Sequence, residues 1–110
     1  MANGLRLIPQ EIRTLEAIEI GSMVPIGTPL PYAVCLLKFV NTSDVDVFIS
    51  WDGRDDHDIC VAGGFVLYDI CTNAGSQRGL YVPAGTQFYV DGSAGTTGAI
   101  FLTAFHTSEY

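Results

Sequence analysis

Apolar and polar residues alternate with a period of two over much of the chain, which is the period of a β-strand with one buried face. The clearest example lies within residues 41–57. One face of that stretch would carry the apolar side chains Val45, Val47, Ile49 and Trp51. The opposite face would carry Asp46, Phe48 and Ser50. An acidic Asp-Gly loop follows directly, so the pattern predicts a β-hairpin.

Similar patterns predict further strands along the chain, at residues 33–40, 64–70, 80–82, 87–90 and 99–106. The first of these is apolar on both faces apart from Lys38, as in a strand buried between two layers. Segments 80–82 and 87–90 flank a Pro-Ala-Gly-Thr sequence, which predicts a second hairpin. In the last strand one face would carry Ala99, Phe101, Thr103 and Phe105.

The spacing of turn residues indicates the fold class. Twelve glycines and five prolines interrupt the predicted strands every eight to twelve residues. This spacing predicts an all-β chain forming one antiparallel β-sandwich or jelly-roll-like domain over residues 1–110. Residues 11–20 fit a helix or a strand, and we assign a strand. Residues 1–12 contain little to anchor them, and we expect a short extended arm that docks on a neighbouring subunit.

The composition indicates a protein partner. Hydrophobic residues make up 48% of the chain and charged residues 15%, against about 25% charged in an average soluble protein. A small domain this apolar is expected to cover part of its surface with copies of itself or with a larger assembly. No apolar run approaches the ~18 residues of a membrane span, and the N-terminus lacks a signal-peptide pattern, so we expect no membrane association.

The net charge of −7 excludes another class of partner. Binding to nucleic acid or to an anionic membrane requires clustered cations that neutralise phosphates. The five cations of this chain are scattered along it, at Arg6, Arg13, Lys38, Arg54 and Arg78. We therefore expect no nucleic-acid partner.

The densest polar cluster is a candidate Ca²⁺ site, formed by Asp52, Asp55, Asp56 and Asp58 together with Gly53 and His57. Carboxylate oxygens are the ligands that Ca²⁺ prefers. The order of residues departs from the EF-hand pattern, since the glycine comes second and no glutamate follows at the twelfth position. The alternative is a solvated hairpin loop whose charges protect an exposed edge from aggregation. We favour the loop, and predict neither a metal nor a cofactor.

The positions of the nucleophilic and basic residues in the sequence do not predict a catalytic pair. His57 could act with Ser50, Asp52 or Cys60, but these pairs diverge on extended strands, and the chain has no G-x-S-x-G elbow. We predict that the protein is not an enzyme. The cysteines, Cys35, Cys60 and Cys71, are odd in number and lack Cys-x-x-Cys spacing, which implies neither a zinc site nor a disulfide framework. Cys35 is interpreted as a small buried hydrophobe in a reducing cytosol.

Aromatic residues supply candidates for an interface. We expect the outward-facing members to be Phe48, Tyr68 and Tyr89, and we expect the N-terminal arm to contribute Leu5, Leu7 and Ile8. A glycan-reading face is an alternative, because carbohydrate-binding sandwiches use exposed aromatic rings as platforms. That alternative requires an exposed Trp51 or Tyr81.

Short motifs in a fixed order run along nearly the whole chain. They are Arg6, Ile26-Gly-Thr-Pro-Leu30, Asn41-Thr-Ser-Asp-Val45, Ile49-Ser-Trp-Asp-Gly53, Asp56-His57, Leu67-Tyr-Asp69, Thr72-Asn73, residues 83–90 and Phe101-Leu-Thr-Ala104. In these motifs the chain resembles small virion structural proteins of tailed bacteriophages. The resemblance implies a compact β-sandwich or jelly roll that decorates or staples the capsid, or sits at the neck and tail.

The same resemblance implies partners and a location. The partners would be further copies of the chain and the major capsid or neck and tail proteins of a virion, assembled in the host cytoplasm. It implies no catalytic residues. A receptor-binding module at a tail fibre remains an alternative. Residues 106–110 are more polar than a buried final strand, so we expect the C-terminus to leave the sheet.

Overall fold

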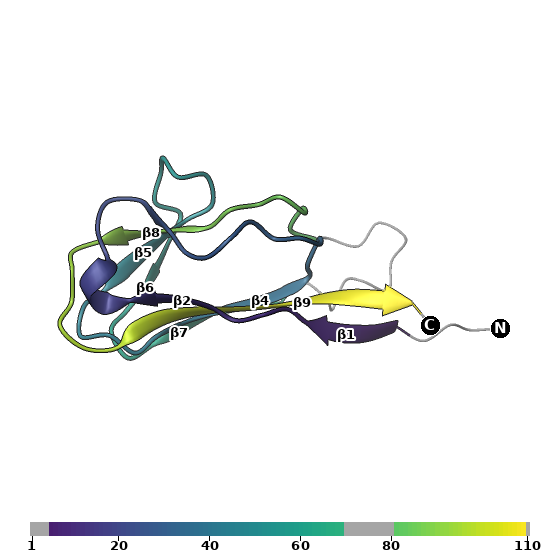
Figure 1. Ribbon diagram of the computed structural model, residues 1–110, viewed down its shortest axis with the longest axis horizontal. Helices are drawn as coiled ribbons and strands as arrows, with labels where there is room; N and C mark the ends of the chain where they lie inside the picture. The colour runs from purple at the N-terminus through teal and green to yellow at the C-terminus, as the bar shows by residue number, and fades with distance from the viewer. Residues whose placement is uncertain (1–4, 70–80, 110) are drawn as a thin grey trace.

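The computed structural model describes residues 5–69 and 81–109, and it is all-β, with two antiparallel sheets packed together as a sandwich (Figure 1). The predicted fold class is therefore confirmed. Within the described residues the elements are β1 (Leu5–Pro9), β2 (Arg13–Glu16), the 3₁₀ helix η1 (Ala17–Glu19), β3 (Val24–Pro25), β4 (Leu36–Asn41), β5 (Val47–Ser50), β6 (Asp58–Cys60), β7 (Phe65–Asp69), β8 (Tyr89–Gly92) and β9 (Ala99–Glu109).

The larger sheet is built around β9. Its strand order is β1-β9-β4-β7, and β2 also pairs with β9. Strands β1 and β2 lie end to end along one edge of β9, with Pro9 opposite Phe105 and Arg13 opposite Leu102. The chain advances four positions from Pro9 to Arg13 while β9 advances three, so a one-residue bulge separates the two strands. The strand predicted within residues 11–20 is confirmed for Arg13–Glu16, and η1 follows it.

The smaller sheet has the order β3-β8-β5-β6. Its β5–β6 hairpin is the one that the alternation predicted, with Val47 opposite Cys60. The second predicted hairpin is wrong. Its turn forms, because the Thr86 amide donates to the Pro83 carbonyl at 3.3 Å, but Val82 pairs with Val34. The turn is a local feature of the sequence, whereas the pairing partner is set by distant parts of the chain.

The hydrophobic core fills the space between the two sheets. Aromatic rings from both sheets meet there edge to face, with centroids 5.4 Å apart for Phe39 and Phe88 and 5.0 Å apart for Trp51 and Phe88. The core positions of β9 are Ile100, Leu102 and Ala104, each at most 1% exposed. The alternation in the last strand predicts that Phe101, Thr103 and Phe105 share a face, and the structure places that face on the side away from the core.

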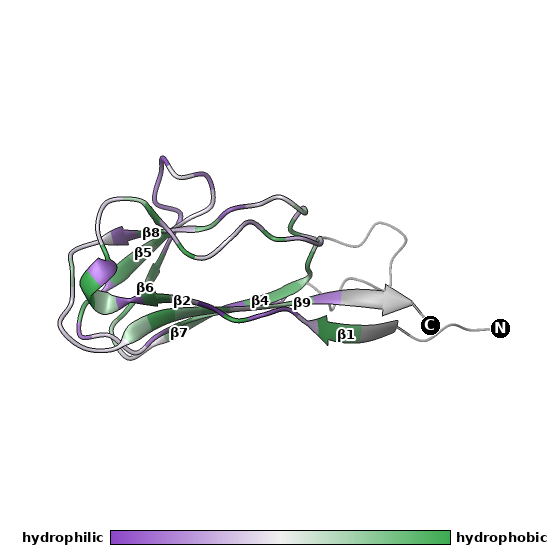
Figure 2. Cartoon of the chain, viewed as in Figure 1, coloured by the Kyte–Doolittle hydropathy of each residue, from purple (hydrophilic) through white to green (hydrophobic). Residues whose placement is uncertain are grey.

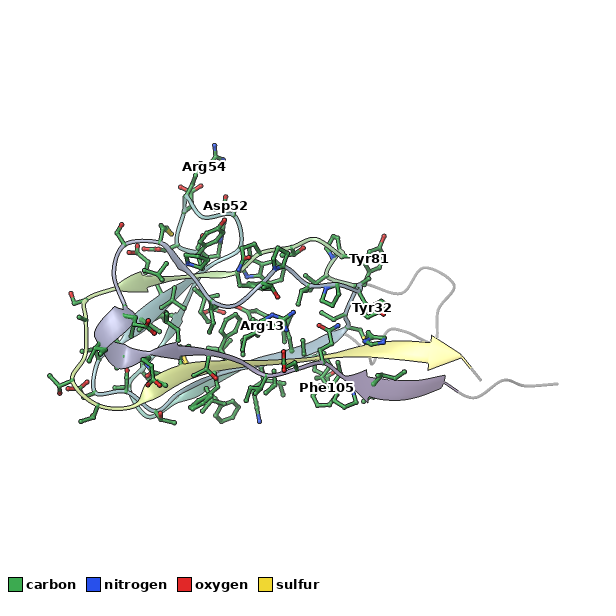
Figure 3. All side chains as sticks on the ribbon, in the orientation of Figure 1. Arg13, Tyr32, Asp52, Arg54, Tyr81 and Phe105 are labelled. Atoms are coloured by element: carbon green, nitrogen blue, oxygen red, sulfur yellow. The ribbon has the colours of Figure 1, made fainter. Side chains whose placement is uncertain are left out.

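A buried arginine holds the segment between β3 and β4 against β2. The Arg13 guanidinium donates to the backbone carbonyls of Thr28 at 2.9 Å, Glu11 at 3.3 Å and Pro29 at 3.5 Å. Figure 3 shows the side chain lying between the two layers. Burial lowers the pKa of Arg13, and the nearby Glu11 partly opposes that effect. Carbonyl oxygens are good partners for this cation because the guanidinium offers five donors in a rigid fork.

Three expectations need correction at the ends of the chain and at Cys35. Leu5–Pro9 pair with β9 of their own chain, so these residues are part of the sheet. Strand β9 continues through Glu109 because β1 pairs with it, so the chain does not leave the sheet after His106. Cys35 is buried as predicted, but it is disulfide-bonded, because spacing alone does not reveal which thiols a fold brings together. Cys60 is a free, buried thiol, and Cys71 lies outside the described residues.

Candidate interaction surface

The face of the larger sheet that points away from the smaller sheet is mostly apolar. Directly opposed residues in antiparallel strands share a face, so the register assigns its members. We call this surface the outer face, and it consists of Leu7, Pro9, Thr14, Glu16, Leu36, Lys38, Val40, Phe65, Leu67, Asp69, Phe101, Thr103 and Phe105. Figure 2 shows hydrophobic residues along β4 and β7 in this sheet, and Figure 3 shows Phe105 pointing away from the smaller sheet.

The outer face is exposed to solvent. Phe65 is 66% exposed and Leu67 is 50% exposed, and their immediate neighbours Leu36 and Val40 are half-buried. The sequence predicted burial of residues 33–40 on both sides, but within the described chain only the inward side is covered. The nearly continuous apolar run correctly indicates two apolar faces on β4. It does not show whether the layer that covers the second face belongs to the same chain.

A shallow hollow of about 230 Å³ lies in the outer face. Its lining includes Leu36, Lys38, Leu67, Thr103 and Phe105. Strands β7, β4 and β9 thus bring together side chains that lie up to 69 positions apart in the sequence. An apolar hollow beside one lysine is suited to the packing of an apolar side chain. The aliphatic part of the lysine can cover apolar surface while its ammonium group remains in contact with water.

The outer face differs electrostatically from the rest of the chain. Lys38 and Asp69, of opposite sign, lie near its centre, and Glu16 lies at its edge, in a chain of net charge −7. Like-charged bodies repel, so a strongly acidic protein associates most easily through a face whose own charges balance. The centre of the outer face, with Lys38 and Asp69, meets that condition.

The residues predicted for an interface fall on different surfaces. Leu7 is exposed on the outer face and Ile8 is half-buried, while Leu5 lies opposite Glu109 at the end of β1. Phe48 is 40% exposed on the outward side of the smaller sheet, opposite Ile59, as expected. The structure therefore does not bring these residues into one patch.

Tyr68 and Tyr89 are less available than expected. The Tyr68 ring packs against the core, edge to face with Trp51 at 5.4 Å, and its hydroxyl donates to Asp58 Oδ2 at 2.6 Å. The ring points inward because Tyr68 lies opposite the buried Leu37 in the β4–β7 register. The sequence did not predict this, because β7 is apolar on both faces and alternation alone does not choose the inward one. Tyr89 is half-buried beneath the acidic loop, where a Cβ on Gly53 would lie 2.9 Å from Tyr89 Cε1.

The acidic loop is held by its own backbone. Asp52 Oδ1 accepts hydrogen bonds from the amides of Arg54 at 2.8 Å and Asp55 at 3.0 Å. The bonds from Asp55 and Arg54 lower the pKa of Asp52 to about 2. Ligand atoms of Asp52, Asp55 and His57 lie within 4.8 Å of one another, and all three residues are exposed. These contacts are those of a solvated loop closed by an aspartate, because the carboxylate is already used by amides that face it.

The candidate catalytic side chains of His57, Ser50 and Cys60 form contacts within their own part of the chain. The His57 Nδ1 atom accepts from the Trp51 amide at 3.1 Å, and Ser50 Oγ accepts from the Gly53 amide at 2.9 Å. The Cys60 thiol points to the Gly64 carbonyl at 3.7 Å, and burial raises its pKa, which disfavours the reactive thiolate. Ser50 Oγ also donates to Asp52 Oδ1 at 3.2 Å, and His57 Nε2 lies 3.9 Å from Asp52 Oδ2. The loop therefore brings together three side chains that the sequence pattern predicted to diverge, and that expectation is wrong.

No family model, no curated protein and no solved structure matches this chain. Among the residues that the structure describes, no helix is long and apolar enough to cross a membrane. Among the described residues, the outer face is the feature from which we infer a function.

Proposed function

We propose that the chain is a non-enzymatic structural subunit of a tailed-bacteriophage particle, which decorates and staples the capsid. The observation that supports this proposal is the uncovered apolar outer face. Exposed contiguous apolar surface on a small domain marks an association site. Its burial stabilises a contact by about 25 cal/mol for each Å² removed from water.

The mechanism would be mechanical. A rigid sandwich that buries its outer face between neighbouring subunits adds contact area, and the added area resists the pressure of packaged DNA. Specific interfaces bury about 1,000 Å² or more in total, so a subunit would combine the outer face with surrounding polar contacts.

The disulfide at Cys35 supports a working location outside the reducing cytosol. Disulfides persist on virion surfaces and in extracellular proteins, and they are rare in cytosolic proteins. A virion subunit is assembled in the cytoplasm and then exposed to an oxidising environment, which is compatible with this bond.

Two alternatives differ in position or in class. A neck or tail connector would use the same surface and would differ in copy number. A glycan- or receptor-binding module is favoured by Tyr81, which is 62% exposed, but Trp51 packs against Phe88 and Tyr68 in the core. A glycan array, together with acrylamide quenching of Trp51 fluorescence, separates this module from a structural subunit.

The test of the proposal is the copy number in purified virions, measured by quantitative mass spectrometry against the major capsid protein. Hundreds of copies would support capsid decoration. Roughly six to twenty-four copies, the number that closed rings and small sets of appendages give, would place the subunit at the neck, tail or fibres. Absence from the particle would overturn the structural proposal.

A further inference from the structure

Four residues at the centre of the outer face form a rectangle with its charges on one diagonal. Leu36 lies opposite Asp69, and Lys38 lies opposite Leu67. Opposed residues are about 5 Å apart across the strands, and residues two positions apart are about 7 Å apart along a strand. Lys38 and Asp69 therefore occupy one diagonal, and the two leucines occupy the other.

We propose that the outer face is covered by the outer face of a second copy of this chain, related by a two-fold axis that lies in the interface close to the leucine diagonal. This inference rests on the proposed function in taking the outer face as the association surface, and it names the partner. A rotation about that axis brings each end of the charged diagonal to within about 3 Å of the position of the other end. Each Lys38 then faces the second copy's Asp69, and leucines pack on leucines.

Self-complementarity is the reason for choosing a second copy over another protein. A two-fold interface uses the same patch twice, so each group must meet its complement on an identical surface. The rectangle fulfils this condition twice, once for each lysine–aspartate contact. A different protein could carry the complementary charges on its own surface. Its binding would not require the outer face to carry opposite charges on one diagonal.

The charge of the whole chain favours the same choice. Two copies of net charge −7 repel one another over most surfaces, whereas the centre of the outer face brings together two cations and two carboxylates. Asp69 already has an interaction within its own chain. A carboxylate has about four lone-pair sites, so it can accept from the second copy's lysine as well.

The proposed axis also fixes how the sheets cross. With the spacings above, the leucine diagonal makes roughly 35° with the strands, so the strands of the two copies cross at roughly 70°. This is close to the orthogonal class of sheet packing, near 90°. The shallow hollow beside Leu67 and Phe105 then receives apolar side chains of the second copy.

The decisive experiment mixes two charge-reversed variants. The wild-type chain is expected to sediment as a dimer at micromolar concentration in analytical ultracentrifugation. Lys38→Asp alone places four carboxylates at the two contacts, and Asp69→Lys alone places four cations there. Each variant should weaken dimerisation by about tenfold or more, because like charges then face each other. An equimolar mixture should recover the dimer, since each contact again joins one acid and one base.

Paired controls on the two sheets locate the interface. Leu67→Glu on the outer face should give a monomer, and circular dichroism and thermal melting will show whether it is folded. Ile59→Glu is the matched control, because Ile59 is 44% exposed on the smaller sheet. Its dimer affinity should equal that of the wild type.

Several results would overturn the inference. They are a wild-type chain that stays monomeric at high concentration, charge variants that dimerise like the wild type, a mixture that fails to recover the dimer, and loss of the dimer with Ile59→Glu. Virion copy number is measured separately. A monomer that is abundant in the particle would refute the dimer and leave the proposed function standing, and a dimer that is absent from the particle would do the reverse.

Discussion

The Asn41 side-chain amide donates a hydrogen bond to the Cys60 carbonyl at 2.9 Å, and this bond joins the two sheets of the sandwich. Asn41 ends β4 in the larger sheet, and Cys60 ends β6 in the smaller one. The same amide donates to the Val45 carbonyl at 2.9 Å, while Asn41 Oδ1 accepts from the Ser43 amide at 2.9 Å. A residue with no exposed surface thus satisfies its donors and its acceptor within the core.

Replacing Asn41 should destabilise the fold strongly. Asn41→Leu leaves the Cys60 carbonyl and the Ser43 amide without their side-chain partner, and the expected loss of unfolding free energy is about 2–4 kcal/mol. Asn41→Asp retains the acceptor but removes both donors and buries a carboxylate, so it should be at least as damaging at neutral pH. Urea denaturation followed by circular dichroism measures both. A loss below about 1 kcal/mol in both variants would show that the link between the sheets is energetically minor.

Gly27 should be less tolerant of a side chain than another glycine of similar conformation. Its φ is +67°, and a Cβ there would lie 2.5 Å from Arg13 Cγ. Gly85 has a φ of +89°, with nothing within 4 Å of its would-be Cβ. Gly85→Ala should cost only the backbone strain, about 1–2 kcal/mol. Gly27→Ala should cost about 1–2 kcal/mol more, because Arg13 must move away from its carbonyl partners. Thermal unfolding of the two variants checks the difference, and equal costs would refute the role of the Arg13 contact.

The contact between the loop that contains Asp44 and the loop that contains Thr96 should weaken at low pH. Its carboxylate accepts from Thr96 Oγ1 at 2.6 Å and from the Thr96 amide at 2.9 Å. These bonds lower the pKa of Asp44 to about 2, below the ordinary value of 3.8. A lowered pKa in the folded state means that the stabilisation is present above about pH 4 and is lost as the pH falls towards 2.

The measurement for Asp44 is an NMR titration of its carboxyl carbon and of the Thr96 amide. Both signals should change with a midpoint near pH 2 in the folded protein. In Asp44→Asn the Thr96 amide should no longer follow that titration. A carboxyl midpoint near the ordinary value would contradict the prediction.

Tyr68 should resist ionisation at high pH. Burial, followed by its hydrogen bond to Asp58, raises the pKa of the phenol well above its ordinary value. A raised pKa in the folded state means that this contribution to stability is complete below about pH 10 and is lost as the pH rises further. Ultraviolet absorbance near 295 nm should show a phenolate transition well above the ordinary tyrosine pKa in the folded wild type, and that transition should be absent from the urea-unfolded chain. Tyr68→Phe should remove that difference.

The sequence predicts well those features that depend on neighbouring residues. Alternation identified the buried apolar positions of β5 and the division of β9 into two faces, and the Asp-Gly loop identified the β5–β6 hairpin. It did not identify which face of β9 is buried. It did not identify the pairing of Val34 with Val82, because that pairing joins segments 48 positions apart. It placed Tyr68 on the outside because β7 is apolar on both faces.

The candidate surface could be predicted only in part. The two apolar faces of β4 are visible in the sequence, and they indicated a strand with a layer on each side. The register of three strands determines which residues of β7 and β9 lie beside Leu36 and Lys38. The periodicity within a single strand does not determine that register. The rectangle of leucines and charges follows from that register.

The position of β9 has a consequence for how the protein folds. It is the last described strand in the chain, yet it lies inside the larger sheet, with β1 and β2 on one edge and β4 on the other. Strands β4 and β7 pair directly with each other, but β1 and β2 cannot join the sheet until β9 is available. Such long-range pairing makes folding slow relative to domains of the same size with local contacts. During synthesis β1, β2 and β4 wait with unpaired edges, and only the completed sheet creates the outer face, so the association that we propose between subunits would follow folding.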